Sequence, residues 1–507
     1  MTDRVPDLVL DRSINERTSL TFEEVRVSTR HSEILPSKTD TKTVFAGDVT
    51  LNIPFVSSPM DTVTEHAMAI AMAENGGIGV IHKGKGMDVQ SQAKEVDRVK
   101  FYLNGLIKTP ITVMSDWTVQ QVLNLKREKQ YPFDTFAVIN STGQLVGHMS
   151  ASDFEFCHDH SVLVSEAMTP FDQLVVTKLG TSQRDAFELM KKSKKKVVYL
   201  FGDDLTSPQM YLYSNLKRLF APGNHRQNID KNGQLRVAVD IGAGGDAMDR
   251  ASEAVRKHAD VLYISTAHGD SKNVIDVAKL VVHAFPDIPL VVGNVSTGEG
   301  ALNLARAGAR SVLVGQGPGR ICTTRVVAGI GKGQVSAVYE VARALQHSGV
   351  TVGADGGLKS SGDVALALCA GADYTVAGGL YAGTDESPGE LQFDPLKNVM
   401  AKHYRGMGSV GAMLDSKAAR DRYLVEEELA DELVPEGVEG TVPYKGPLKK
   451  QLHQLNGGVR KCMGYLGCSS IRDLHQHAQF WQQGQGGINE AHPSVTIIKP
   501  APNYSGR

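Results

Sequence analysis

The 507-residue sequence has only five cysteines, few aromatic residues (6%) and almost no net charge (−2). No histidine lies beside Cys462 and Cys468 at metal-site spacing, so we expect reduced thiols rather than a disulfide framework or a zinc site. The charge balance gives no indication of nucleic-acid or anionic-membrane binding. No apolar run reaches the ~18 residues of a membrane helix, and the N-terminus has no apolar signal core. We therefore expect a cytoplasmic protein.

Glycine, in contrast, is abundant, and the 51 glycines suit a protein of strands, turns and helices with many ligand-facing loops. The most informative loop is 315–325, which follows the apolar, β-branched run 311–314. Its glycines let the backbone approach a ligand closely. Cys322 lies in this loop, where positive charge from Arg320 and Arg325 would favour the nucleophilic thiolate. The alternative is an inert thiol at an ordinary strand–loop–helix connection, which the glycine-rich approach makes less favourable.

Short apolar strands followed by polar or glycine-rich loops recur along the chain. After residue 235 five such units follow one another, with strands expected at 261–264, 289–292, 311–314, 350–354 and 374–377. This alternation predicts an α/β fold, a (β/α)8 TIM barrel, whose chemistry belongs at the carboxyl ends of the strands. The Gly-Gly pairs 356–357 and 378–379 follow the last two strands, where backbone amides can hold a phosphate.

Residues 101–217 interrupt this alternation and contain one pattern twice. Each copy has a strand, a capped helix, a strand, a turn and a further strand. The segment resembles a tandem cystathionine-β-synthase (CBS) pair, or Bateman module, which implies adenine or guanine nucleotide effectors. We therefore expect residues 1–100 to form an N-terminal arm and the first part of the barrel. Residues 218–507 would form the remainder of the barrel with the active-site loop, a flap and a C-terminal segment.

Several stretches resemble the IMP dehydrogenase / GMP reductase family and occur in the family order over nearly the whole chain. They are 57–65 (SSPMDTVTE), 315–324 (GQGPGRICTT), 354–357 (ADGG), 382–390 (AGTDESPGE), 404–409 (YRGMGS), 435–440 (PEGVEG) and 457–460 (GGVR). The CBS pair is also inserted where that family carries it. The resemblance therefore covers the barrel and the insertion together.

The resemblance implies an enzyme that oxidises a purine nucleoside monophosphate with NAD, above all IMP to XMP. Cys322 would attack carbon 2 of the purine, hydride would pass to the nicotinamide, and water would hydrolyse the thioimidate. The family's hydrolytic residues correspond to Thr324 and to the flap pair Arg422 and Tyr423. A guanidinium normally stays protonated, so the role of Arg422 as a base rests on the resemblance alone. The alternative for Arg422 is a surface salt bridge.

The resemblance also assigns residues to the nucleotide. Asp355 would accept hydrogen bonds from the ribose hydroxyls, Glu436 would accept the ring N–H, and backbone amides at Met407 and Gly408 would bind the 6-oxygen. The full set expected to bind the substrate is Ser58, Met60, Arg320, Asp355, Gly356, Gly357, Gly378, Gly379, Tyr404, Gly406, Met407, Gly408 and Glu436.

Cofactor and metal sites follow from the same resemblance. NAD is expected at Ser265, Thr266, Asn294, Gly315, Gln316 and Gly317. A potassium ion would be bound by carbonyl groups of Gly317, Gly319 and Cys322, and completed from a neighbouring subunit by Gln485, Gly486 and Gly487. This shared ion and the family analogy imply a homotetramer, and pairing of tetramers into octamers stays open.

Three ligand-contacting positions depart from the family pattern. Ser265 stands where the family usually has an aspartate that holds the ribose of the nicotinamide half of NAD. Arg320 and Gly379 stand where phosphate-binding serines are usual. Arg320 would either pair with the phosphate or fill its site, and could offset both lost hydroxyls. These changes suggest a divergent paralogue.

Three alternatives to IMP oxidation therefore stay open. A GMP reductase would use NADPH to convert GMP to IMP and ammonia; the pair Gly378 and Gly379 favours it and the flap pair opposes it. A paralogous dehydrogenase would act on another purine nucleotide, such as AMP. A catalytically weak, nucleotide-sensing paralogue would rely on the CBS pair, but the intact set Cys322, Thr324 and Arg422 with its tyrosine opposes this alternative.

Overall fold

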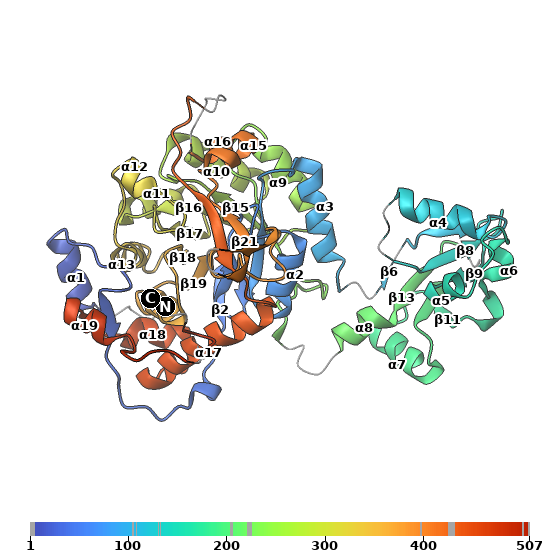
Figure 1. Ribbon diagram of the computed structural model, residues 1–507, viewed down its shortest axis with the longest axis horizontal. Coiled ribbons are helices and arrows are strands. Elements are labelled where there is room, and N and C mark those ends of the chain that lie inside the picture. The colour runs from blue at the N-terminus through green and yellow to red at the C-terminus, as the bar shows by residue number, and fades with distance from the viewer. Residues whose placement is uncertain are drawn as a thin grey trace. The chain divides into compact units, whose positions relative to one another are not determined.

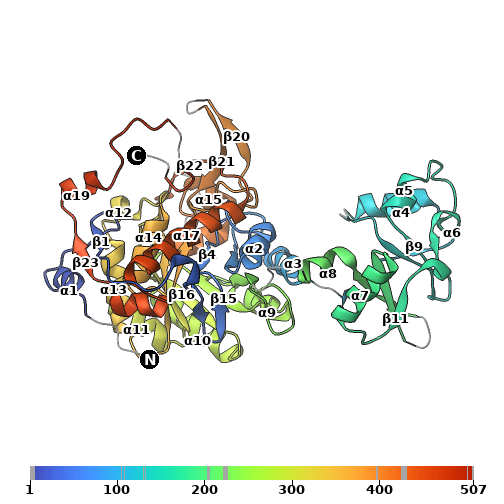
Figure 2. The same ribbon diagram turned by 90° about the horizontal axis from the view of Figure 1, so that it is seen from below.

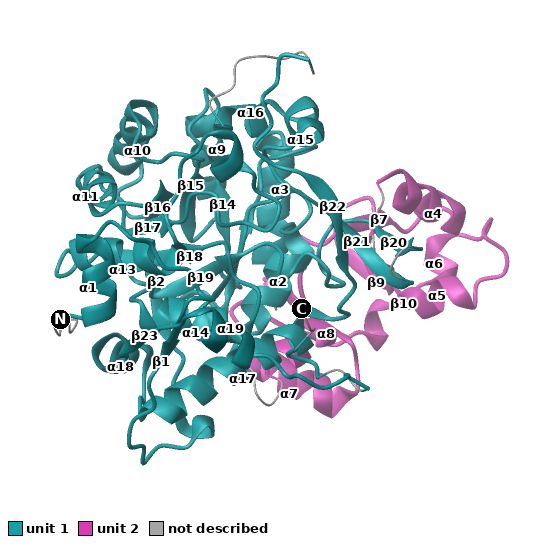
Figure 3. Ribbon diagram, turned by 60° about the vertical axis from the view of Figure 1, so that its left-hand side comes forward, with its two compact units in different colours: residues 1–101, 226–507 teal, residues 102–225 magenta. Residues whose placement is uncertain are grey.

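The computed structural model describes residues 6–103, 106–107, 109–129, 131, 133–202, 206–220, 226–395, 398–423, 431–498 and 501–504. The chain forms two compact units (Figure 3). One unit comprises residues 1–101 and 226–507, and the other comprises residues 102–225. Among the described helices, none combines the length and the apolar character that a membrane span requires.

Eight parallel strands of the larger unit form a closed barrel with helices around it (Figure 1), which confirms the predicted (β/α)8 TIM barrel. In barrel order they are β14 (Ala238–Asp240), β15 (Val261–Ser265), β16 (Leu290–Val295), β17 (Ser311–Val314), β18 (Thr351–Asp355), β19 (Tyr374–Ala377), β4 (Phe55–Ser57) and β5 (Ile78–Ile81). Strands β17 and β19 are buried along their whole length. Both faces of a parallel barrel strand are covered, which explains the continuous apolar runs in the sequence.

The helices of the larger unit lie outside the barrel strands, as the view from below also shows (Figure 2). They are α1 (Leu8–Asn15), α2 (His66–Glu74), α3 (Val89–Lys100), α9 (Ala247–Arg256), α10 (Lys272–Ala284), α11 (Gly298–Arg306), α12 (Thr324–Val327), α13 (Gln334–Ala344), α14 (Ser361–Cys369), α15 (Val410–Asp415), α16 (Lys417–Tyr423), α17 (Leu448–Leu466), α18 (Ile471–His477) and α19 (Gln485–Glu490), with the 3-10 helix η1 (Pro36–Lys38). Helix α1 lies in the expected N-terminal arm, and its Leu10 is fully buried.

Short additional sheets complete the larger unit. They are β1 (Val25–Val27) with β23 (Phe480–Gln482), β2 (Thr43–Ala46) with β3 (Val49–Leu51), and β20 (Leu391–Asp394) with β21 (Val399–Arg405) and β22 (Glu439–Pro443). The hairpin β2–β3 shares one apolar core with Ile78, Val261 and Tyr374, which begin their strands. The hairpin therefore closes the amino end of the barrel and leaves the carboxyl end for the site.

The smaller unit contains two four-stranded sheets, β10-β9-β8-β7 and β11-β12-β13-β6. Its elements are β6 (Leu106–Ile107), β7 (Thr112–Met114), α4 (Val119–Glu128), β8 (Phe136–Ile139), β9 (Leu145–Met149), α5 (Ala151–Glu155), α6 (Val164–Ala167), β10 (Thr169–Pro170), η2 (Phe171–Gln173), β11 (Val176–Lys178), α7 (Gln183–Ser193), β12 (Val197–Phe201), β13 (Gln209–Leu212) and α8 (Tyr213–Leu219). In both halves a strand pairs in parallel with the next strand, which pairs antiparallel with a third. The two halves thus repeat one topology.

Candidate active site

The loop after β17 brings Cys322 to the carboxyl end of the barrel. At its start Gly315 has a φ of 146°, and a Cβ there would lie 2.2 Å from the carbonyl oxygen of Asp355. Only glycine fits this close approach between neighbouring strand ends. The Sγ atom of Cys322 lies 3.0 Å from the hydroxyl oxygen of Thr324, which begins α12 and is buried. The structure thus brings together the thiol and the hydroxyl that the resemblance assigns to the reaction.

A segment more than a hundred residues further along the chain holds the cysteine loop in place. The N–H of Thr323 donates to the carbonyl of Glu436 (2.8 Å), and the N–H of Val438 donates to the carbonyl of Ile321 (2.9 Å). The N–H of Glu436 in turn donates to the carbonyl of Gly408 (3.0 Å). Three of the stretches that carry the family resemblance are therefore hydrogen-bonded to one another around Cys322.

Asp355, at the end of β18, faces the same space. Its Oδ2 atom accepts a hydrogen bond from Asn294 Nδ2 (2.8 Å), and this amide also donates to the carbonyl of Gly315 (2.9 Å). Burial raises the pKa of Asp355, although the hydrogen bond from Asn294 and the charge of Arg422 partly offset the rise. A carboxylate fixed in this way presents a hydrogen-bond acceptor to a ligand hydroxyl.

The glycine-rich turns after β18 and β19 lie against the cysteine loop, the first beside Pro318 and the second beside Arg320. Gly356 and Gly357 have φ values of 84° and 78°, which L residues rarely adopt. A Cβ on Gly379 would lie 3.1 Å from the Cδ atom of Arg320. The Arg320 guanidinium donates to the carbonyl of Lys359 (3.3 Å).

A buried lysine adds positive charge to this end of the site. Lys445 donates to the carbonyls of Gly379 and Leu380, at 3.1 and 2.9 Å. Burial, with a smaller contribution from the charge of Arg320, lowers the pKa of Lys445 to about 8. Cationic side chains and backbone amides together suit an anionic group.

The described end of the flap, in α16, lies over the other side of the site. The N–H of Ala267 donates to the carbonyl of Arg422 (3.1 Å), and a Cβ on Gly408 would lie 2.7 Å from the ring of Tyr423. Burial lowers the pKa of Arg422, but Tyr423, Asp240 and Asp355 raise it by more, so that the pKa is raised overall. Burial also raises the pKa of Tyr423 to about 12, although Arg422 opposes the shift. The guanidinium is therefore held in its charged form.

Most of the predicted residues line one cavity of about 120 Å³. They are Met60, Thr266, Asn294, Gly315, Gln316, Gly317, Gly319, Cys322, Thr324, Asp355, Gly356, Gly378, Tyr404, Gly406, Met407, Arg422 and Tyr423. A small-molecule site usually has roughly 300–1,000 Å³. Arg422 and Tyr423 of α16 therefore border the same cavity as Cys322 and Asp355.

The other predicted residues lie outside this lining. The N–H of Glu436 donates to the carbonyl of Gly408, and Arg320 lies beside Gly379. Ser58 and Ser265 are buried at strand ends, and Gly357 follows Gly356. Gln485, Gly486 and Gly487 begin α19, and within the described ranges no hydrogen bond joins them to loop 315–325. The potassium site stays a prediction.

Sequence reasoning missed two buried charged residues at the mouth of the barrel. Asp240 ends β14, and Lys83 follows β5. Burial lowers the pKa of Lys83 and raises that of Asp240, and each charge opposes the shift of the other. The available signal was an aspartate at the end of an apolar run, immediately before the glycine-rich stretch 242–245.

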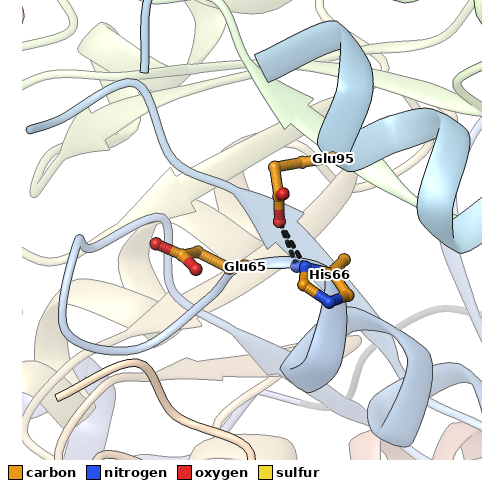
Figure 4. A group of neighbouring side chains, drawn as sticks. All are labelled: Glu65, His66 and Glu95. Carbon is orange, nitrogen blue, oxygen red and sulfur yellow. Dashed lines mark hydrogen bonds and ion pairs between the residues drawn. The ribbon is translucent and has the colours of Figure 1, made fainter. Parts of the chain in front are cut away.

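A cluster of two glutamates and a histidine lies outside the cavity (Figure 4). Candidate ligand atoms of Glu65, His66 and Glu95 lie within 4.8 Å of one another. The Glu95 carboxylate, however, accepts hydrogen bonds from the ring and the N–H of His66, each at 2.7 Å, and from Arg98 at 2.6 Å. Burial raises the pKa of Glu95, but the bonds from His66 lower it by more. These contacts connect the start of α2 to α3.

The sequence profile of the IMP dehydrogenase / GMP reductase domain matches residues 19–494. The chain belongs to this family. Inosine-5′-monophosphate dehydrogenases of Pasteurella multocida and Escherichia coli (strain K12) are each 40% identical to it over 489 residues, which cover 96% of this chain and 98% of each relative.

Among solved structures, a GMP reductase variant from Trypanosoma brucei in complex with guanosine 5′-monophosphate is similar, with a TM-score of 0.87 and 32% identity. The match covers 96% of this chain and 100% of that chain. The family resemblance expected from the sequence is thus confirmed over nearly the whole length. The matches include IMP dehydrogenases and a GMP reductase. The residues of the site are therefore needed to distinguish the two activities.

Proposed function

We propose that this protein oxidises IMP to XMP with NAD as the hydride acceptor. The observation that carries the proposal is the flap pair Arg422 and Tyr423, which lines the same cavity as Cys322. A dehydrogenase must hydrolyse the covalent adduct and therefore needs a positioned water, whereas a reductase does not. The dehydrogenase relatives at 40% identity support the same conclusion.

In the proposed reaction the Cys322 thiolate attacks carbon 2 of the base, and a covalent thioimidate remains after hydride departure. NAD, when bound, accepts that hydride. Asp355 binds the ribose hydroxyls of the nucleotide, and Glu436 accepts the ring N–H. The Thr324 hydroxyl lies 3.0 Å from the sulfur, and this proximity supports its role in hydrolysis of the adduct.

Arg422 has a raised pKa, so in the arrangement described here it holds its proton and orients the hydrolytic water. We assign removal of the water proton to a path that includes Thr324. The residues available to NAD fit a polar ligand, because Asn294 Oδ1 and Ser265 Oγ are buried and have no hydrogen-bond partner within the described parts of the chain. Thr266 and Gln316 lie at the same strand ends.

We further propose that Arg320 binds the nucleotide phosphate together with Lys445 and the turns at Gly357 and Gly379. The smaller unit is proposed to be a CBS pair that binds adenine or guanine nucleotides, because its two halves repeat one topology. Carbonyl groups of Gly317, Gly319 and Cys322 would bind potassium, with residues 485–487 of a neighbouring subunit in a homotetramer.

The decisive test is nicotinamide absorbance with purified full-length protein, NAD and potassium, with IMP, AMP and GMP assayed separately. NADH formation with IMP alone is expected. NADH formation with another nucleotide would make Arg320 and Gly379 specificity determinants for that substrate.

The second candidate is a GMP reductase, which the likeness to the Trypanosoma brucei enzyme and the pair Gly378 and Gly379 favour. NADPH consumption with GMP, in the absence of any NAD reduction, would replace the proposed function with this one. The CBS-centred alternative would be favoured if neither reaction occurred.

A further inference from the structure

Asp240 is a buried carboxylate that the proposed reaction does not use. It is 1% exposed and ends the strand β14, at the carboxyl end of the barrel where the site lies. Its Oδ1 atom accepts hydrogen bonds from the N–H groups of Gly242 (3.1 Å) and Ser265 (3.4 Å). Among the described residues no hydrogen-bond donor reaches its Oδ2 atom. Burial of a carboxylate costs free energy, and a buried acceptor oxygen usually has a hydrogen-bond donor. The Oδ2 atom is therefore available to a donor from a ligand.

The position of this carboxylate relative to Ser265 is set by the barrel register. Asp240 pairs with Tyr263 on the neighbouring strand β15, and side chains two residues apart on a strand share a face. Asp240, Tyr263 and Ser265 therefore share one face of the two strands. The Oγ atom of Ser265 is buried and has no hydrogen-bond partner among the residues that the structure describes. The Asp240 carboxylate thus lies beside Ser265, the position at which the family usually has an aspartate.

We propose that Asp240 is a cofactor-binding residue that supplies, from the neighbouring strand, the carboxylate absent at position 265. Its Oδ1 atom is anchored on backbone amides, and its Oδ2 atom accepts a hydrogen bond from a sugar hydroxyl on the nicotinamide side of the dinucleotide. Carboxylates form strong, charge-assisted hydrogen bonds with such hydroxyls. This inference rests on the proposed function, because it requires a dinucleotide cofactor.

The flap uses the same carboxylate in the arrangement described here. The charge of Asp240 contributes to the raised pKa of Arg422, and Lys83, which also faces Asp240, donates to the carbonyl of Ala418 in α16 (2.8 Å). Two cations therefore compensate Asp240 while α16 lies over the site. A sugar hydroxyl of the bound cofactor would give Oδ2 the hydrogen-bond donor that it lacks, which the charge of Arg422 does not provide. The competing explanation is that Asp240 acts only through Arg422, by stabilising its positive charge, and does not contact the cofactor.

The test separates cofactor binding from turnover. In a Cys322→Ala background, which blocks chemistry, NAD is titrated calorimetrically into full-length protein saturated with IMP. Asp240→Asn is expected to raise the NAD dissociation constant about ten- to a hundredfold, as loss of a charge-assisted hydrogen bond does. The IMP dissociation constant should stay unchanged. Asp249→Asn, an exposed carboxylate on α9, is the matched control and should change neither constant.

A rescue variant keeps the proposal falsifiable if Asp240→Asn does not fold. The double variant Asp240→Ala with Ser265→Asp moves the carboxylate to the neighbouring strand and should recover most of the NAD affinity. Weak NAD binding by a folded double variant would overturn the proposal. An unchanged NAD dissociation constant in Asp240→Asn would overturn it as well. If this variant with Cys322 intact then hydrolysed the adduct more slowly, Asp240 would act through Arg422 instead of through the cofactor. Failure of the unmodified protein to reduce NAD with IMP would instead count against the proposed function.

Discussion

Arg320 and Gly379 are sterically coupled: a Cβ at position 379 would lie 3.1 Å from the Cδ atom of Arg320. The two departures from the family pattern at the proposed phosphate site are therefore one structural change, in which the glycine makes room for the arginine. At position 320 an arginine replaces the serine that is usual in the family, which puts a permanent positive charge near Lys445 instead of a neutral hydroxyl. This relationship leads directly to a double-variant experiment.

We expect Arg320→Ser to raise the KM for IMP about tenfold or more, because the proposed charge-assisted contact to the phosphate would be lost. Gly379→Ser should also raise KM, because its Cβ crowds the Cδ atom of Arg320 and shifts that side chain. The double variant should be better than the product of the two single effects, since the displaced group is absent and two hydroxyls become available. Gly362→Ser is the control, because a Cβ there meets only ordinary van der Waals contact. Strictly additive effects would contradict the coupling.

Cys322→Ala should abolish turnover and leave IMP binding within about twofold of the unmodified protein, because the thiol forms the covalent bond but contributes little to ground-state affinity. Steady-state rates and calorimetric titration measure the two quantities. Cys157→Ala, in the smaller unit, is the control and should keep full activity. Turnover by the Cys322 variant would disprove the covalent mechanism.

Arg422→Lys should slow hydrolysis of the adduct by about 10²-fold or more and leave hydride transfer nearly unchanged, because a lysine retains charge but loses the fork geometry that orients water. Rapid-quench experiments should then show a burst of NADH and accumulation of covalently modified Cys322. Arg420→Lys, on the same helix, serves as the control. An equal loss in hydride transfer would argue that Arg422 acts before hydrolysis.

His148 makes the stability of the smaller unit pH-dependent. Its Nδ1 atom is hydrogen-bonded to the hydroxyl of Tyr199 (2.9 Å), and burial lowers the pKa of His148 from 6.5 to about 4, with Asp153 opposing and Lys195 adding to the shift. Between these two values the unfolded chain binds a proton at His148 that the folded unit does not bind. The stability of the folded unit is therefore highest above pH 6.5 and falls as the pH is lowered toward about 4. The loss amounts to about 3 kcal/mol. Burial also raises the pKa of Tyr199, which keeps that hydroxyl neutral throughout this range.

Urea unfolding of the full chain between pH 7 and about 4.5 should show this loss in the transition of the smaller unit. His148→Gln retains a hydrogen-bonding group but does not titrate, so its pH dependence should be flatter. An equally steep profile in this variant would assign the acid sensitivity to other groups.

The sequence by itself determined the barrel strands, the cysteine loop and the family. Each of these depends on local pattern: a β-branched run followed by glycines indicates a buried strand and a ligand-facing turn wherever the chain continues afterwards. The motif residues at 57–65, 315–324 and 354–357 could therefore be assigned without knowledge of their neighbours. Helix α1 was less evident, because apolar and polar residues alternate within its short stretch and only Leu10 and Ser13 are buried in it.

Only the tertiary structure decided which of these local features meet. The loops that follow β17 and β19 meet at the carboxyl end of the barrel and bring Glu436 to Thr323, and the strand register brings Asp240 to Ser265, although no local pattern connects either pair. The missing carboxylate at position 265 was visible in the sequence, but its neighbour was not, because proximity across parallel strands depends on register and closure rather than on sequence spacing. For the same reason the glycine at position 379 could be understood only once Arg320 was seen beside it.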